Sequence, residues 1–204
     1  IPYKNDSWLG DNTDIEGFIY PLKNKENWSN KSALILGSGG SAKAVFAGLK
    51  ELGFKKISIA GRSKDSLNNF IKNLNFDIKD IEVRGLAFQE NSIRDTIKES
   101  NLIINTTPVG MYQSNSNYNK TMPMPFGKEV WDNLLPNTIL YDLVYNPNPT
   151  EWLKKGLEKN CEIIDGLEML IQQGAASLRL WSGIKEIPIE EMRKAAKLYL
   201  KSKK

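Results

Sequence analysis

A glycine-rich turn near residue 37 is the pattern that most strongly predicts a ligand site. The segment Gly37-Ser-Gly-Gly-Ser-Ala42 follows the apolar run 32–36 and opens the helical pattern 42–52. Glycines at such a turn let the backbone approach a pyrophosphate, while the helix N-terminus offers N–H groups and positive potential. A plain strand-to-helix turn is the alternative, and the strand-turn-helix context favours dinucleotide binding. The candidate residues are Gly37, Ser38, Gly39, Gly40 and Ser41.

The end of the next apolar run carries positive charge. Ala60-Gly-Arg-Ser-Lys64 ends the run 56–60, where NAD-preferring domains place Asp or Glu to hold the ribose 2′-hydroxyl. A guanidinium, a hydroxyl and an ammonium suit a 2′-phosphate dianion instead. The turn therefore favours NADP over NAD, with a solvated basic turn as the alternative. The candidate residues are Gly61, Arg62, Ser63 and Lys64.

Three further polar segments each follow an apolar run. They are Asn105-Thr-Thr-Pro-Val-Gly-Met111, the stretch from Asp142 through Tyr145 to Thr150, and Asp165-Gly through Gln173. Ligands of open α/β sheets bind at the carboxyl ends of the strands, so all three are candidates for one site. The alternatives are an ordinary strand-end turn, a Pro-rich loop with a packed Tyr, and a solvated helical Gln rather than a hydrogen-bond partner for a polyol.

One polar motif precedes all of these elements. Gly10-Asp-Asn-Thr-Asp14 is either a turn that leads into a helix cap or a polar site for a small molecule. In the second interpretation, Asp14 accepts a hydrogen bond or transfers a proton.

Histidine and cysteine chemistry are excluded or nearly excluded by composition. The chain has no His and one Cys, Cys161. It therefore lacks an imidazole general base, a Ser-His-Asp triad, a His-ligated metal and an internal disulfide framework. A lone Cys in an apolar setting is typical of a core residue. We expect no bound metal, and any proton chemistry must use carboxylate, Lys or Tyr groups.

Charge and hydropathy favour a soluble globular protein. The net charge is +4, with 40% hydrophobic and 25% charged residues, as in soluble domains. The basic end 194–204 is typical of a solvated helix end rather than a nucleic-acid site. No apolar run approaches the roughly 20 residues of a membrane span, and no signal peptide is visible. We expect a cytoplasmic protein without a nucleic-acid or membrane partner.

Alternating strand and helix patterns must position these residues. The spacing predicts βαβ units, and thus an α/β fold with a Rossmann-type, doubly wound parallel sheet. Before it, 2–9 is a possible edge strand, 14–20 a short helix and 24–30 a polar linker, while 112–127 is a long loop. The predicted strands are 32–36, 56–60, 81–87, 102–105, 138–142 and 162–165; the predicted helices are 42–52, 64–74, 93–100, 151–159, 167–180 and 189–200.

Taken in order, these motifs resemble those of the shikimate dehydrogenase family. The shared motifs are Gly-x-Asn-Thr-Asp, Gly-x-Gly-Gly-x-Ala, the basic Arg-Ser turn, Asn-x-Thr-Pro-x-Gly-Met, Asp-x-x-Tyr-x-Pro and Asp-Gly-x-x-Met-Leu-x-x-Gln. The resemblance implies a remnant and hinge of a substrate domain at 1–23, an NADP-binding domain at 24–180 and a C-terminal helix at 181–204 that packs toward the substrate domain. Most of that N-terminal α/β domain is expected to be absent, and the chain to be a poorly active part of a two-domain enzyme.

The resemblance also implies an activity and roles for single residues. The activity is the NADP-dependent reversible reduction of 3-dehydroshikimate to shikimate in aromatic amino-acid biosynthesis, by a monomer or homodimer. Asp14 matches a catalytic, substrate-binding Asp that pairs with a Lys. The other implied contacts are Tyr145 and Gln173 with substrate, Leu143 and Gly166 with nicotinamide, and Asn105 and Thr106 with the cofactor. The resemblance also extends the 2′-phosphate turn from Gly61 through Asp65 and Ser66. The alternatives are a quinate/shikimate dehydrogenase paralogue and a non-catalytic NADP-binding module.

The chain departs from the family pattern at two places. Gly61 stands where the family usually has Asn, which leaves the following basic residues to select the cofactor. Ile1-Pro-Tyr-Lys4 resembles the segment that holds the family's catalytic lysine, but little sequence separates it from Asp14. Lys4 is therefore either that lysine, with a segment left out after it, or a chance match. Without a substrate domain, we expect Leu9, Phe18, Ile19 and the last two helices to be exposed.

Overall fold

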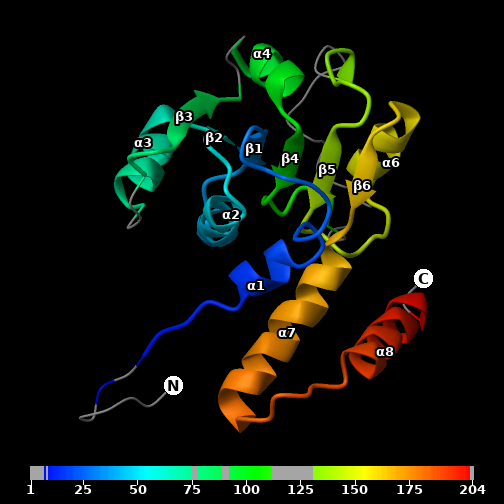
Figure 1. The fold of residues 1–204 in the computed structure, drawn as a ribbon. Coiled ribbons are helices and arrows are strands. Elements are labelled where there is room, and N and C mark those ends of the chain that lie inside the picture. The colour runs from blue at the N-terminus through cyan, green and yellow to red at the C-terminus, as the bar shows by residue number, and fades with distance from the viewer. Residues whose placement is uncertain (1–6, 8, 75–77, 89–91, 112–130, 203–204) are drawn as a thin grey trace.

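A parallel sheet forms the centre of the computed structural model, which describes residues 7, 9–74, 78–88, 92–111 and 131–202. Its six strands have the order β3-β2-β1-β4-β5-β6 (Figure 1). The first three strands therefore extend the sheet in one direction from β1, and the last three extend it in the other direction from β4. This confirms the predicted doubly wound sheet. The strands are β1 (Ser32–Leu36), β2 (Lys56–Gly61), β3 (Glu82–Ala87), β4 (Leu102–Asn105), β5 (Ile139–Asp142) and β6 (Glu162–Ile164).

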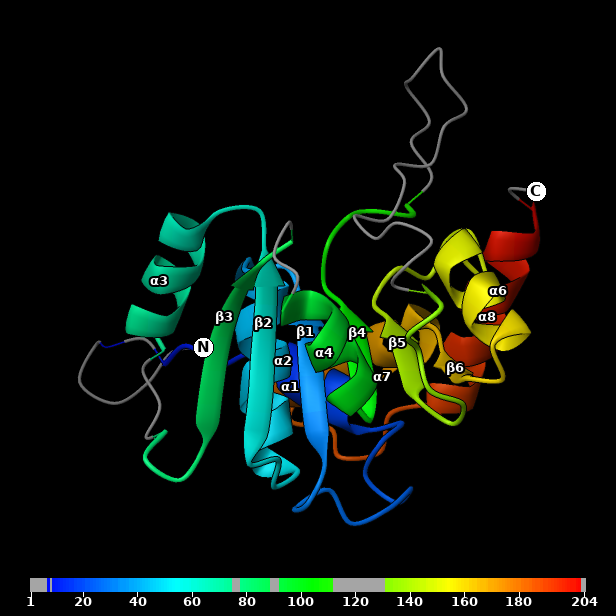
Figure 2. The same cartoon turned by 90° about the horizontal axis from the view of Figure 1, so that it is seen from above.

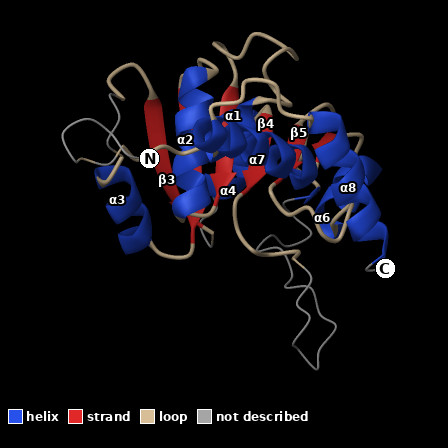
Figure 3. Ribbon diagram, turned by 90° about the horizontal axis from the view of Figure 1, so that it is seen from below, coloured by secondary structure: helices blue, strands red, loops and turns tan. Residues whose placement is uncertain are grey.

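Helices cover both faces of the sheet, which explains why its central strands are almost wholly apolar. Figures 2 and 3 show α1, α2 and α7 on one face, with α4 and α6 on the other. Two separate apolar cores result, one on each side of the sheet. The helices are α1 (Asp14–Ile19), α2 (Gly40–Glu51), α3 (Lys64–Lys72), α4 (Ser92–Glu99), α6 (Glu151–Glu158), α7 (Gly166–Ser182) and α8 (Ile189–Ser202).

Most predicted helices are confirmed to within two residues at each end. Ser63 caps α3, because its side chain accepts a hydrogen bond from the Ser66 N–H. Gly53 follows α2 with φ of +94°, a left-handed conformation that suits glycine. The predicted loop 112–127 and most of the predicted edge strand 2–9 lie outside the described residues.

Helix α1 packs into the apolar core between the sheet and α2, which corrects the expectation that Phe18 and Ile19 are exposed. Phe18 is fully buried and stacks on Tyr141 with ring centroids 5.2 Å apart. A Cβ on Gly17 would lie 2.6 Å from the Met169 carbonyl oxygen, so glycine lets α1 approach α7 closely. The sequence pattern of a short helix gave no sign of this close packing. Leu9, by contrast, is exposed as predicted.

The polar segment 24–30 is anchored rather than free, because it contains a buried tryptophan. Trp28 is 2% exposed and stacks on Phe54 with ring centroids 5.1 Å apart. Its indole N–H donates to the Leu22 carbonyl at 3.2 Å. The segment has no helix or strand, as expected of a linker between α1 and β1, but its tryptophan fixes it to the core.

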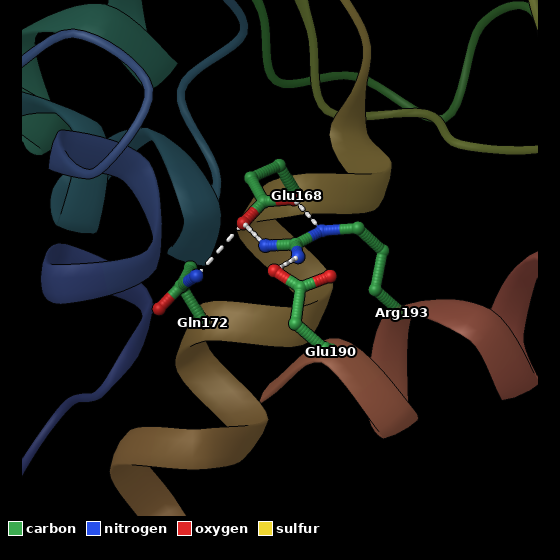
Figure 4. Close-up of polar contacts among 4 residues, drawn as sticks. All are labelled: Glu168, Gln172, Glu190 and Arg193. Atoms are coloured by element: carbon green, nitrogen blue, oxygen red, sulfur yellow. Dashed lines mark hydrogen bonds and ion pairs between the residues drawn. The ribbon is translucent and has the colours of Figure 1, made fainter. Parts of the chain in front are cut away.

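Helix α8 is joined to α7 through Arg193, as Figure 4 shows. The Arg193 guanidinium donates to both carboxylate oxygens of Glu168, at 2.9 and 2.6 Å, and also pairs with Glu190. Gln172 donates to the same Glu168 at 2.7 Å. These hydrogen bonds with Arg193 and Gln172 lower the pKa of Glu168.

The end of α7 and helix α8 carry exposed apolar side chains, as expected for the last two helices. No residue of α8 is buried. The exposed large side chains include Trp181 on α7, Leu198 and Tyr199 on α8, and Ile184 in the connection between them.

None of the helices that the structure describes has the length and apolar character that a membrane span requires.

The burial of Phe18 predicts that α1 is part of the domain core. Phe18→Ala should lower the free energy of unfolding by about 3–5 kcal/mol, the usual cost of deleting a buried aromatic ring. Tyr20→Ala, at the exposed residue that directly follows α1, should change it by less than about 0.5 kcal/mol. Urea unfolding monitored by circular dichroism measures both. Similar losses in the two variants would contradict the packing of α1.

Candidate functional site

An open pocket lies at the carboxyl ends of β1, β2 and β4, where the strand order reverses. Its volume is about 810 Å³. This is the position at which ligands bind in open α/β sheets. It is lined by the glycine turn after β1, the basic turn after β2 and the turn after β4: Gly37, Ser38, Gly39, Gly61, Arg62, Ser63, Ser66, Phe88, Thr106, Thr107, Pro108 and Val109.

The glycine turn leaves the start of α2 open to a ligand. A Cβ built on Gly39 or Gly40 meets no atom within 4 Å, and the helix receives no capping hydrogen bond from the Gly39 position. The first N–H groups of α2 therefore remain for an anion such as a pyrophosphate. Gly37 has φ of +111°, and a Cβ there would lie 2.7 Å from the Thr106 hydroxyl. Glycine is thus required where this turn meets the turn after β4.

The turn after β2 supplies the positive charge of the pocket. Arg62 is exposed and is the only charged residue among those that line the described pocket. Lys64 and Asp65 are exposed in the first turn of α3 and do not belong to this lining. The Ser66 hydroxyl lies 2.8 Å from the Ser38 hydroxyl, so this turn contacts the glycine turn. The lining residues therefore fit a nucleotide with an additional phosphate group.

Two buried residues hold the loops after β4 and β5 together. Asn105 and Asp142 are both fully buried, and the Asn105 amide donates to Asp142 at 2.9 Å. The same amide donates to the Val109 carbonyl at 3.0 Å and accepts from the Thr107 hydroxyl at 2.7 Å. The side chain of Asn105 is therefore occupied within the protein and does not line the pocket, whereas its neighbour Thr106 does.

Asp142 extends this network into α6. It accepts hydrogen bonds from the Thr150 hydroxyl at 2.7 Å and from the Val144 N–H at 3.0 Å. Thr150 in turn caps α6. The pKa of Asp142 is raised to about 6. Burial is the largest cause, and it outweighs the opposite effect of the hydrogen bonds from Thr150, Val144 and Asn105. The sequence marked Asp142 only as the first residue of a polar segment at a strand end and did not predict its buried structural role.

The predicted nicotinamide-side residues Leu143 and Gly166 are in contact. A Cβ on Gly166 would lie 2.1 Å from the Leu143 carbonyl oxygen, so only glycine fits. Asp165 caps α7 through the Leu167 N–H at 2.8 Å and accepts from Asn148 at 2.9 Å. These bonds hold the loop that carries the half-buried Tyr145.

The Asn-Thr-Asp motif meets the predicted substrate glutamine. The Thr13 hydroxyl lies 3.5 Å from Gln173 Oε1, across 160 residues of sequence, and 2.9 Å from the Ser177 hydroxyl. Asp14 begins α1 and is half-buried, and its N–H donates to Asn12 at 3.1 Å. Sequence reasoning missed Thr13 and Ser177 as the connecting residues.

The structure does not join the remaining two predicted substrate-side residues to Asp14 and Gln173. Lys4 lies outside the described residues. No hydrogen bond among the described residues joins Tyr145 to Asp14 or Gln173. In the same part of the chain, no group of three or more Cys, Asp or Glu residues is placed to hold a metal ion.

The raised pKa of Asp142 predicts a pH-dependent cost to stability. Its folded-state pKa exceeds the unfolded value of 3.8, so its contribution to the free energy of unfolding falls as pH rises from about 4 to about 6. Asp142→Asn removes this titration, and the Thr150 hydroxyl can accept from the new amide. The stability of the variant relative to the wild type should rise by up to about 3 kcal/mol between about pH 4 and pH 7.

Urea unfolding at a series of pH values measures this difference. The exposed Asp80→Asn variant controls for the loss of one negative charge. A stability difference between Asp142→Asn and the wild type that stays constant with pH would contradict the raised pKa.

Comparisons with known proteins agree with this geometry. The family model of the shikimate 5′-dehydrogenase C-terminal domain matches residues 166–197. The NADP(+) shikimate dehydrogenase of Prochlorococcus marinus subsp. pastoris is 52% identical over 196 residues, covering 96% of this chain and 66% of the relative. That of Prochlorococcus marinus strain MIT 9515 is 48% identical and is covered to 68%, along 98% of this chain. The chain thus spans about two thirds of the length of these relatives.

Solved structures of similar fold include proteins with bound nucleotides. Shikimate 5-dehydrogenase from Listeria monocytogenes, in complex with shikimate and NAD, has a TM-score of 0.77 at 27% identity, covering 95% of this chain and 65% of that one. Quinate dehydrogenase from Corynebacterium glutamicum, in complex with NAD, also has a TM-score of 0.77, at 26% identity with coverages of 95% and 64%. A shikimate dehydrogenase in complex with NADP+ has a TM-score of 0.69 at 29% identity, with coverages of 94% and 63%.

The likeness therefore covers nearly the whole chain. Because a relative 48% identical is covered over more than two thirds of its own length, the chain belongs to the shikimate dehydrogenase family.

Proposed function

We propose that this chain is the NADP-binding part of a shikimate dehydrogenase, which reversibly reduces 3-dehydroshikimate to shikimate. The observation that carries the proposal is the contact between Thr13 and Gln173. It joins a polar motif from the start of the chain to the helix that begins at Gly166, opposite Leu143. A protein that only bound a nucleotide would have no need for this second polar group. The reaction belongs to aromatic amino-acid biosynthesis in the cytoplasm.

The cofactor pocket fits NADP through its backbone and its charge. The open N-terminus of α2 at Gly39 and Gly40 suits the pyrophosphate. Arg62, with the hydroxyls of Ser63 and Ser66 nearby in the lining, suits a 2′-phosphate, and no carboxylate of the described lining opposes it. NADP(H), when bound, donates or accepts the hydride. The contact between Leu143 and Gly166 shapes the surface proposed for the nicotinamide ring.

The substrate side is built for a polyol and for proton transfer. The Gln173 amide can donate and accept hydrogen bonds with substrate hydroxyls. Asp14, at the start of α1, would hold and orient the reacting hydroxyl of the substrate. Asp14 and a lysine would together exchange a proton with the oxygen of that hydroxyl. Lys4 is the proposed lysine on the family resemblance. These roles need correct positioning and a general acid–base pair, and no metal.

The domain division follows from the same proposal. Residues 24–180 form the NADP-binding domain, 1–23 the hinge side of the substrate domain, and 181–204 the helix that packs toward that domain in a longer chain. The buried Phe18 supports a hinge that is fixed on the cofactor side. We propose a monomer or homodimer. A quinate/shikimate dehydrogenase is the second candidate, because quinate dehydrogenase matches this fold as well as shikimate dehydrogenase does.

The cofactor assignment predicts a selective effect of Arg62. Arg62→Ala should weaken NADP+ binding about tenfold to a hundredfold, the range for losing one charged hydrogen-bond partner. NAD+ binding should change little, because NAD+ lacks the 2′-phosphate. Calorimetric titration of this chain with each nucleotide measures both. Arg84→Ala, which removes an exposed arginine at the opposite end of the sheet, is the matched control. Equal losses for NADP+ and NAD+ would contradict the assignment.

The substrate assignment predicts a loss of turnover without a loss of cofactor. In a chain extended to the length of its relatives, Asp14→Asn should lower kcat for shikimate oxidation at least about a hundredfold, the contribution typical of a general acid–base group. The affinity for NADP+ should stay within about twofold of the wild type.

Asp95→Asn, an exposed carboxylate on α4, controls for the change of charge. Unchanged turnover in the Asp14→Asn variant would overturn the role of Asp14. Turnover of quinate rather than shikimate by the extended wild type would select the second candidate.

A further inference from the structure

The hydroxyl groups of Ser38 and Ser66 form a bridge within the proposed cofactor pocket. Ser38 belongs to the glycine turn after β1, and Ser66 to the first turn of α3. Their oxygens lie 2.8 Å apart, within hydrogen-bond distance. Both residues line the pocket. The bridge therefore connects the turn proposed for the pyrophosphate with the turn proposed for the 2′-phosphate.

Ser66 is fixed from two sides. Its N–H donates to the Ser63 hydroxyl at 3.2 Å, which caps α3, while its own hydroxyl reaches Ser38. Arg62 and Ser63 lie directly before this helix start, so their place relative to the glycine turn depends on where α3 begins. A shift of Ser66 away from Ser38 would carry the whole turn with it.

Gly61, the last residue of β2, lies beside the bridge. A Cβ at this position would lie 3.0 Å from Leu67 Cδ2 and 3.5 Å from the Ser38 hydroxyl oxygen. The backbone at position 61 therefore lies against the buried Leu67 of α3 and close to Ser38 of the glycine turn. The end of β2 thus borders both segments that the hydroxyl bridge joins.

We propose that Ser66 is a positioning residue that, through Ser38, sets the preference of this pocket for NADP over NAD. The proposal rests on the proposed function of the pocket. The bridge holds the Arg62-Ser63 turn at the distance from the glycine turn that a 2′-phosphate requires. NAD+ uses only the glycine turn and the ribose contacts, so it should depend less on the bridge.

Calorimetric titration of this chain with NADP+ and NAD+ tests the proposal. Ser66→Ala and Ser38→Ala should each raise the Kd for NADP+ about tenfold, as for the loss of one hydrogen bond of typical strength, and the Kd for NAD+ less than about threefold. Because both variants break the same bond, the double variant should bind NADP+ no more than about twofold more weakly than Ser66→Ala alone. Ser66→Thr keeps the hydroxyl and should restore the preference.

Ser58→Ala, in the middle of β2, is the matched control, and thermal unfolding checks that all variants fold. Equal losses for the two nucleotides, multiplicative losses in the double variant, or an unchanged Kd in folded Ser66→Ala would each overturn the proposal. A wild-type chain that binds neither nucleotide would instead overturn the proposed function of the pocket, and with it this inference.

Discussion

The hydrogen bond between Asn105 and Asp142 is the contact on which the candidate site most depends. Both side chains are fully buried, and their other hydrogen bonds run outward to the turn after β4, the loop after β5 and the cap of α6. An unpaired polar group at such depth would be costly, so each member requires the others. The network therefore fixes two loops of the sheet edge relative to each other before any ligand binds.

Glycines at close approaches make the rest of this arrangement possible. Gly37 lets the first turn meet Thr106, Gly166 lets α7 begin against Leu143, and Gly17 lets α1 lie against α7. In each case an added Cβ would lie within 3 Å of a neighbouring atom. The contact between Thr13 and Gln173 thus depends on the close packing of α1 against α7 as well as on the polar groups themselves.

The sheet was predictable because its strands are short apolar runs separated by amphipathic helices, a pattern that few other folds produce. The glycine turn and the basic turn were predictable because their position after a strand fixes their place at the sheet edge. The burial of Phe18 was not, since it depends on close approaches that exist only in the folded chain: Gly48 of α2 lies against the Phe18 ring, and Gly17 of α1 lies against α7. Asn105 was placed near the cofactor by its motif, but its side chain proves to hold the protein together. No periodicity distinguishes a polar residue that faces a ligand from one that faces another buried polar group.

The most direct test of the account is a crystal structure of this chain with NADP+. The central claim is that the pocket at the ends of β1, β2 and β4 holds this nucleotide through its backbone and one arginine. The account predicts the pyrophosphate at the N–H groups of the turn 39–41 and the 2′-phosphate within hydrogen-bond distance of the Arg62 guanidinium. A nucleotide bound elsewhere, or a 2′-phosphate that points away from Arg62 into solvent, would contradict it.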